Sequence, residues 1–150
     1  MEIGIFGILN IFDIYLGIYC TKLFKKEGVF MLIFFYVLNV TLLFLHEIES
    51  GYEKEWEILK IPGKITGFLL LHIPILFVFF YGFYCILKYP QMKVIISIII
   101  GTAGFIPFIV HKIIFKRNEH FNKIISNILI FGNIITGILL IIFGIIDKNA

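Results

Sequence analysis

Hydrophobic residues form five long runs along the chain, and short polar segments separate them. Each run approaches or exceeds the ~17–25 residues that a helix needs to cross the hydrocarbon core of a bilayer. Apolar runs of this length predict helices, because a spanning helix satisfies its backbone hydrogen bonds internally. The runs cover residues 3–23, 29–45, 65–87, 94–110 and 124–146. The pattern therefore predicts an all-α integral membrane bundle of five transmembrane helices in a single domain, residues 1–150.

The first run is the one whose role has an alternative. It contains Asp13, and an ionised carboxylate within a bilayer is costly, so this residue should be neutral or paired. Asp13 shares a helical face with Asn10 and Gly17, which we expect to face the bundle. The alternative is four spans preceded by an N-terminal half-buried helix.

Composition supports a membrane protein and argues against a nucleic-acid partner. The chain is 60% hydrophobic and 15% charged, with a mean hydropathy of +1.02. Soluble domains are about 45–50% apolar and about 25% charged. The net charge is +3, but the lysines sit at the ends of apolar runs, where they anchor a protein at lipid headgroups. The lipid bilayer is thus the expected environment, and we expect no nucleic-acid binding.

The short connections predict where the histidines gather. Polar segments at residues 25–28, 89–93 and 116–120 are brief, so sequential helices should run antiparallel. Two spans separate His46 from His111, which places both on one membrane side, opposite Lys26 and Lys93. His72 lies about seven residues into the third run, or ~10 Å below that surface at 1.5 Å per residue. Basic residues are nearly balanced between the two sides, so the cytoplasmic side stays open.

His46 and Glu49 form the first candidate site. At a spacing of i, i+3 they project from one helical face, as ligands do in helical-bundle metal sites. If the second helix continues past the membrane, Asn39, Glu53, Glu57 and Lys60 join the same stripe. The metal-binding candidates are therefore His46, Glu49, Glu53 and His72, which suit zinc, iron or manganese. The plainer interpretation is a solvated interfacial face on which Lys54 and Lys60 balance the acids.

Among the remaining histidines, His72 stands out because an imidazole inside an apolar helix needs a partner. We expect His46, Glu49 and His72 to converge as a catalytic group; the alternative for His72 is a structural hydrogen bond. Pro74 follows two positions later and can kink the helix. His111 and His120 are expected to mark a headgroup-facing loop with Lys116 and Arg117.

One segment resembles a family. His46-Glu47-Ile48-Glu49 is followed by Glu55-Trp56-Glu57, then by Pro62-Gly63 and the apolar run with His72. This order resembles small bacterial and archaeal multi-pass membrane proteins of unknown function with a His-Glu-Ile-Asp, Glu-Trp-Glu and Pro-Gly segment. The His-x-x-Glu core is also similar to that of HXXEE-motif membrane proteins, with Ser50 at the second glutamate. The resemblance implies a multi-pass protein of a prokaryotic cell membrane, with no established activity.

Three functions follow as hypotheses. The first is a membrane-embedded enzyme, with or without a divalent metal, that acts on a lipid or isoprenoid-like substrate. The second is a small transporter or proton-coupled permeation unit that uses Asp13 and His72. The third is a non-catalytic subunit that docks a partner through its acidic segment at residues 52–56. The first is preferred, because the polar groups cluster at one surface; a homo-oligomer is compatible with all three.

Overall fold

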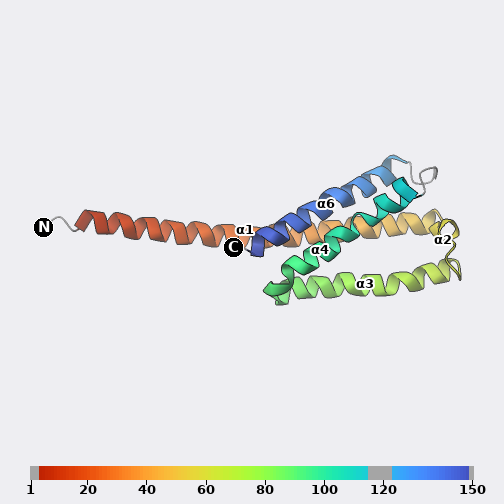
Figure 1. Ribbon diagram of the computed structural model, residues 1–150, viewed down its shortest axis with the longest axis horizontal. Coiled ribbons are helices and arrows are strands. Elements are labelled where there is room, and N and C mark those ends of the chain that lie inside the picture. Colours follow the sequence, from red (N-terminus) through yellow and green to blue (C-terminus); the bar gives the residue numbers. More distant parts are fainter. Residues whose placement is uncertain (1–3, 115–122, 149–150) are drawn as a thin grey trace.

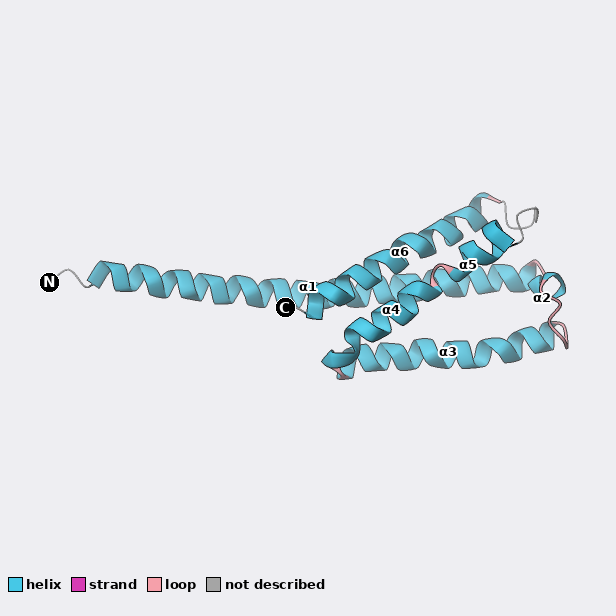
Figure 2. Cartoon of the chain, viewed as in Figure 1, coloured by secondary structure: helices cyan, strands magenta, loops and turns pink. Residues whose placement is uncertain are grey.

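A computed structural model describes the backbone of residues 4–114 and 123–148, and the side chains of residues 27–114 and 123–147. Every element in these ranges is helical, which confirms the all-α bundle (Figures 1 and 2). The elements are α1 (Gly4–Tyr52), α2 (Glu55–Ile58), α3 (Ile65–Lys88), a 3-10 turn η1 (Pro90–Met92), α4 (Lys93–Ala103), α5 (Ile106–Phe108), a π-helical segment η2 (Ile109–Ile114) and α6 (Ile124–Lys148).

Four helical segments of the described chain are long and apolar enough to cross a bilayer. They are Glu27–Tyr52, Ile65–Lys88, Pro90–Ile114 and Ile124–Asp147. The turn predicted at residues 25–28 is wrong, because α1 continues through these residues as one helix. Lysine and glutamate are good helix formers, and one glycine costs only about 1 kcal/mol in a helix interior. The side chains of Asn10 and Asp13 lie outside the described part of the structure.

The distribution of side chains is that of a membrane protein. Large apolar residues point outward: Phe30 is 66% exposed, Phe77 71% and Ile124 82%. Ten polar or charged residues of the described chain are buried instead, as expected where lipid surrounds the bundle. The buried polar or charged residues are Asn39, His46, Ser50, Glu55, Ser97, His111, Ser126, Asn133, Thr136 and Asp147.

Small residues bring α4 and α6 into backbone contact. A Cβ atom added to Gly137 would meet the carbonyl oxygen of Gly101 at 2.4 Å, so glycine is required there. Beside this contact, Asn39 of α1 donates a hydrogen bond to the Ile100 carbonyl at 3.1 Å. Thr136 donates to the Asn39 side-chain oxygen at 2.9 Å. Small and polar side chains of α1, α4 and α6 therefore face one another inside the bundle.

The helix α3 packs differently from α4 and α6. The α3 and α4 helices meet at the η1 turn and diverge toward the opposite end, while α4 crosses over to α6 (Figure 1). Lys93, the first residue of α4, forms an ion pair with Asp147 near the end of α6. This ion pair and the η1 turn mark one end of the bundle, and the described histidines, His46, His72 and His111, lie at the other.

The connection between α1 and α3 reverses the chain sharply. α1 ends at Tyr52, and Lys54 adopts a left-handed conformation with φ of 53°. The polar stripe could reach Glu57 and Lys60 only if the helix continued, and this condition is not met, because the helical phase is lost at this turn. Glu57 is exposed, whereas the turn directs Glu55 into the bundle.

Candidate functional site

Three histidines and two glutamates line one cavity of about 170 Å³ at the end of the bundle. His46 and Glu47 come from α1, Glu55 from α2, His72 from α3 and His111 from η2. The other lining side chains are apolar, among them Phe68 and Pro107. The expectation that His46, His72 and His111 gather at one end is confirmed.

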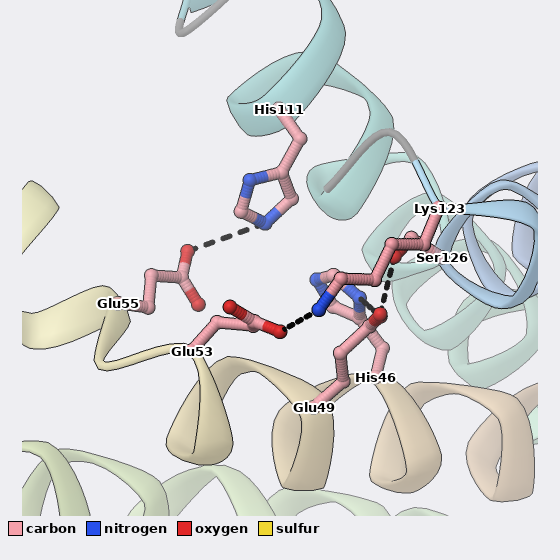
Figure 3. A network of polar contacts seen from close by, with 7 residues as sticks. All are labelled: His46, Glu49, Glu53, Glu55, His111, Lys123 and Ser126. Carbon is pink, nitrogen blue, oxygen red and sulfur yellow. Dashed lines mark hydrogen bonds and ion pairs between the residues drawn. The ribbon is translucent and has the colours of Figure 1, made fainter. Parts of the chain in front are cut away.

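His46, Glu55 and His111 form the most compact group in this cavity. One ligand atom from each residue lies within 4.8 Å of the other two, and all three residues are buried. His111 Nε2 is 3.3 Å from Glu55 Oε1, and the two imidazole rings are 5.0 Å apart at an angle of 70°. The side chains converge from three elements (Figure 3). Metal bonds to imidazole or carboxylate are about 2.0–2.2 Å, so the three groups must approach slightly further to share one ion.

Glu55 is an unusual residue to find buried. It is 6% exposed although it belongs to the polar connection between two spans. Burial raises the pKa of Glu55 above its ordinary value, and the neighbouring Ser50 partly offsets this rise. A carboxylate held in such surroundings is stabilised by a cation, because the charged form has lost most of its water.

His111 reaches the cavity from an irregular part of the third span. Pro107 lacks a backbone N–H and interrupts the regular α-helix, and the chain continues as a π-helix from Ile109 to Ile114. Single π-helical turns inside spans are frequent at functional sites. The interpretation of His111 as a headgroup-facing residue is wrong, since it is 4% exposed and faces Glu55. His120 lies outside the described residues.

His72 has a different partner from the one expected. Its Nε2 is 2.5 Å from Glu47 Oε2, and its Nδ1 is 2.7 Å from the Phe68 carbonyl oxygen. A carbonyl only accepts hydrogen bonds, so Nδ1 carries a proton and donates it. The short contact at Nε2 therefore holds a further proton between imidazole and carboxylate. His72 and Glu47 form a proton-sharing pair in the same cavity as His46.

Glu49 and Glu53 face α6 rather than this cavity. Glu49 accepts a hydrogen bond from Ser126 and lies 3.8 Å from His46 Nδ1. Glu53 pairs with Lys123. His46 is 2% exposed, which rules out the alternative of a solvated His46–Glu49 face. The predicted contact between His46 and Glu49 is present, but His72 meets Glu47 instead of Glu49.

The sequence did not single out Glu47, Glu55 or His111 as members of the group. A signal for His111 was available, because two spans return the chain to the side of His46. Glu47 follows His46 on α1, so its side chain points about 100° further around the helix. This direction leads to α3, where Glu47 meets His72. Glu55 could not be found from helical phase, because the left-handed turn at Lys54 resets the direction of the chain.

Comparison with known proteins gives a family and nothing further. A protein-family model described as a family of unknown function, DUF6713, matches residues 32–147. No curated protein and no solved structure matches the chain. The matched region contains all five polar residues of the cavity, and it covers the four candidate spans of the described residues except for residues 27–31 of the first. The chain therefore belongs to the DUF6713 family, whose function is unknown.

Proposed function

We propose that this protein is a membrane-embedded metalloenzyme that acts on a lipid-like substrate. The observation that carries the proposal is the buried group of His46, Glu55 and His111, whose ligand atoms lie within 4.8 Å of one another. Two imidazoles and one carboxylate form a ligand set that zinc uses in catalytic sites, where a fourth position stays open. The set differs from the sequence-based candidates, since Glu55 and His111 replace Glu49, Glu53 and His72 beside His46.

The burial of Glu55 also supports a bound cation. Glu47, Glu49, Glu53 and Glu55 all lie at this end of the bundle, and Lys123 pairs with Glu53. The charge of Glu47 is balanced by the proton that it shares with His72. Glu55 lies beside His111 and is buried. A divalent ion would compensate the charge of Glu55 where water cannot.

The chemistry expected of such an ion is Lewis-acid catalysis. A divalent metal with an open position polarises a carbonyl or phosphoryl oxygen, or lowers the pKa of a bound water. The His72–Glu47 pair lines the same cavity and is suited to move a proton during the reaction. Because the cavity lies between spanning helices, the substrate that reaches it would be a molecule that partitions into the bilayer.

A second candidate, proton-coupled transport, is favoured by a separate observation. Buried polar side chains continue from the cavity toward the Lys93–Asp147 end, among them Asn133 and Ser97. Direct backbone packing between Gly101 and Gly137 lies along this course and leaves little room for water. A proton flux through proteoliposomes, lost in a His72→Gln variant, would favour transport over the metalloenzyme. Docking of a partner through residues 52–56 stays a prediction.

Zinc stoichiometry tests the metalloenzyme proposal. The detergent-purified protein should bind one zinc ion per chain, and His111→Ala and Glu55→Gln should each abolish binding at the same zinc concentration. His72→Gln is the matched control, because His72 lines the cavity without belonging to the compact group, and it should keep the zinc. Wild-type protein that binds no zinc, iron or manganese, or equal loss in all three variants, would overturn the proposal.

A further inference from the structure

A second cavity adjoins the cavity that His46, Glu55 and His111 line, and it lies closer to the bilayer centre. It has a volume of about 260 Å³ and lies between α1, α3 and α4. The two cavities share four lining residues, Glu47, Ile75, Ile106 and Pro107. They are therefore neighbouring parts of one space between α3 and α4, which diverge from the η1 turn (Figure 1).

The two cavities differ in polarity along the direction of the membrane normal. The deeper cavity is lined by apolar side chains such as Leu43, Val78 and Ala103, with Glu47 where it meets the polar cavity. The order of residues on each helix agrees with this: Leu43 precedes His46 on α1, Ala103 precedes His111 on the third span, and on the antiparallel α3 His72 precedes Val78. The combined space is thus polar near the membrane surface and apolar toward the bilayer centre, which is how a lipid molecule is polarised in its own leaflet.

The mouth of the deeper cavity opens toward lipid. Ile75, Val78, Ile99 and Ile106 all line a cavity wall, and they are 37–56% exposed. At this depth the surrounding medium is hydrocarbon, so the opening is accessible to a lipid chain that moves sideways between α3 and α4. A volume of 260 Å³ lies below the ~300–1,000 Å³ of pockets that take drug-sized ligands. The cavity therefore suits one hydrocarbon chain better than the two chains of a diacyl lipid.

We propose that the cavity between α1, α3 and α4 binds the single hydrocarbon chain of an amphiphilic substrate. The polar end of this substrate then faces the His72–Glu47 pair and the group of His46, Glu55 and His111. The inference rests on the proposed function, because the reaction at the polar end is the one proposed for the metal. It adds the class of substrate, which is a single-chain amphiphile. The chain enters from the bilayer between α3 and α4. Its head would then lie in the polar cavity, where His46, Glu55 and His111 would hold an ion that can bind an oxygen atom of the head.

The test uses a palmitic acid analogue with a photoreactive diazirine near the middle of its chain. The full-length protein is reconstituted in phosphatidylcholine vesicles, irradiated with the probe and digested, and the labelled residues are identified by mass spectrometry. Labelling should concentrate at residues 75–79 and 99–103. It should be competed by unlabelled palmitic acid.

Two adjacent isoleucines of α4 provide a matched pair of variants. Ile99 lines the cavity, whereas Ile98 is similarly exposed, at 42% against 49%, and is absent from the cavity wall. Ile99→Trp should lower the competed labelling several-fold, and Ile98→Trp should leave it unchanged. Val78→Trp and Phe77→Trp give an equivalent pair on α3, in case a substitution on α4 disturbs folding.

Zinc stoichiometry on the same preparations separates this inference from the proposed function. If labelling concentrates at the cavity in a protein that binds no metal, the hydrocarbon-binding cavity is supported and the metalloenzyme proposal is overturned. If zinc binds normally and labelling is spread evenly over the lipid-facing helices, the hydrocarbon-binding cavity is overturned and the metalloenzyme proposal is not. Equal labelling of Ile99→Trp and Ile98→Trp, repeated in the α3 pair, would also overturn the hydrocarbon-binding cavity.

Discussion

The two ends of the bundle bury charged groups in opposite ways. At one end, Lys93 and Asp147 face each other directly, and the Asp147 side chain is 1% exposed. At the other, Glu55 lies beside the His111 ring, 3.3 Å away, and His46 completes the group. The first arrangement compensates its charges within the protein, as expected of a structural contact. The second brings together groups that bind cations, around a cavity of about 170 Å³. Buried polar groups therefore indicate a metal-binding site only when they are side chains that bind cations and when they line a cavity.

The largest expected effect comes from breaking the compensated end. Lys93→Leu would leave Asp147 as an unpaired buried acid, and removing one partner of a buried ion pair costs about 3–5 kcal/mol. We expect the free energy of unfolding in detergent to fall by this amount, while zinc binding stays at one ion per chain. The double variant Lys93→Leu/Asp147→Leu should recover most of the loss. A single variant as stable as wild type would show that the contact is incidental.

A smaller effect tests whether the middle of the bundle holds the two ends in register. Gly137→Ala places a Cβ against the Gly101 carbonyl oxygen, a backbone atom that cannot move aside. Overpacking of this kind costs about 1–3 kcal/mol. Gly132→Ala is the control on the same helix, because its nearest atom is the flexible Leu42 Cδ1 at 3.2 Å. Thermal unfolding should separate the two variants, and equal melting temperatures would contradict the close packing of α4 on α6.

The smallest expected effect is a pH dependence at the metal-binding end. The pKa of Glu55 is raised in the folded protein, so the folded state binds this proton more tightly than the unfolded state. Metal-free protein should therefore lose stability as pH rises from the ordinary pKa of 4.5 through the raised value. Bound zinc should reverse the trend, because zinc needs the ionised carboxylate. Thermal unfolding of wild type and Glu55→Gln measures this, and an identical pH dependence in both metal-free proteins would contradict it.

The sequence predicted the parts of the fold that depend on hydrophobic length. Apolar runs located all four described spans, and counting spans placed His46 and His111 together. The turn at residues 25–28 was predicted wrongly, because a short charged segment of helix-forming residues does not by itself interrupt a helix. Hydrophobicity detects where a helix is apolar, and it carries less information on where a helix ends.

The composition of the site was predicted less well, for a geometric reason. Helical phase is reliable within α1, and it correctly placed His46 beside Glu49. It fails across the left-handed residue Lys54, after which Glu55 turns into the bundle. Glu55 lies directly after this turn, whereas His111 was placed on the correct side of the membrane and was wrongly interpreted as a residue that faces the headgroups. Sites built on backbone irregularities require coordinates, whereas sites built on one regular helix can be found from spacing.

X-ray absorption spectroscopy at the zinc edge tests the central claim most directly, because it reports the atoms bound to the ion. Zinc-loaded protein in detergent should show a first shell of nitrogen and oxygen at about 2.0–2.2 Å, with the outer-shell scattering of two imidazole rings. His46→Ala, loaded at the highest zinc concentration that it tolerates, should lose one of these rings. A shell with sulfur at about 2.3 Å, or an all-oxygen shell without imidazole scattering, would contradict the assignment of His46, Glu55 and His111 as the metal site.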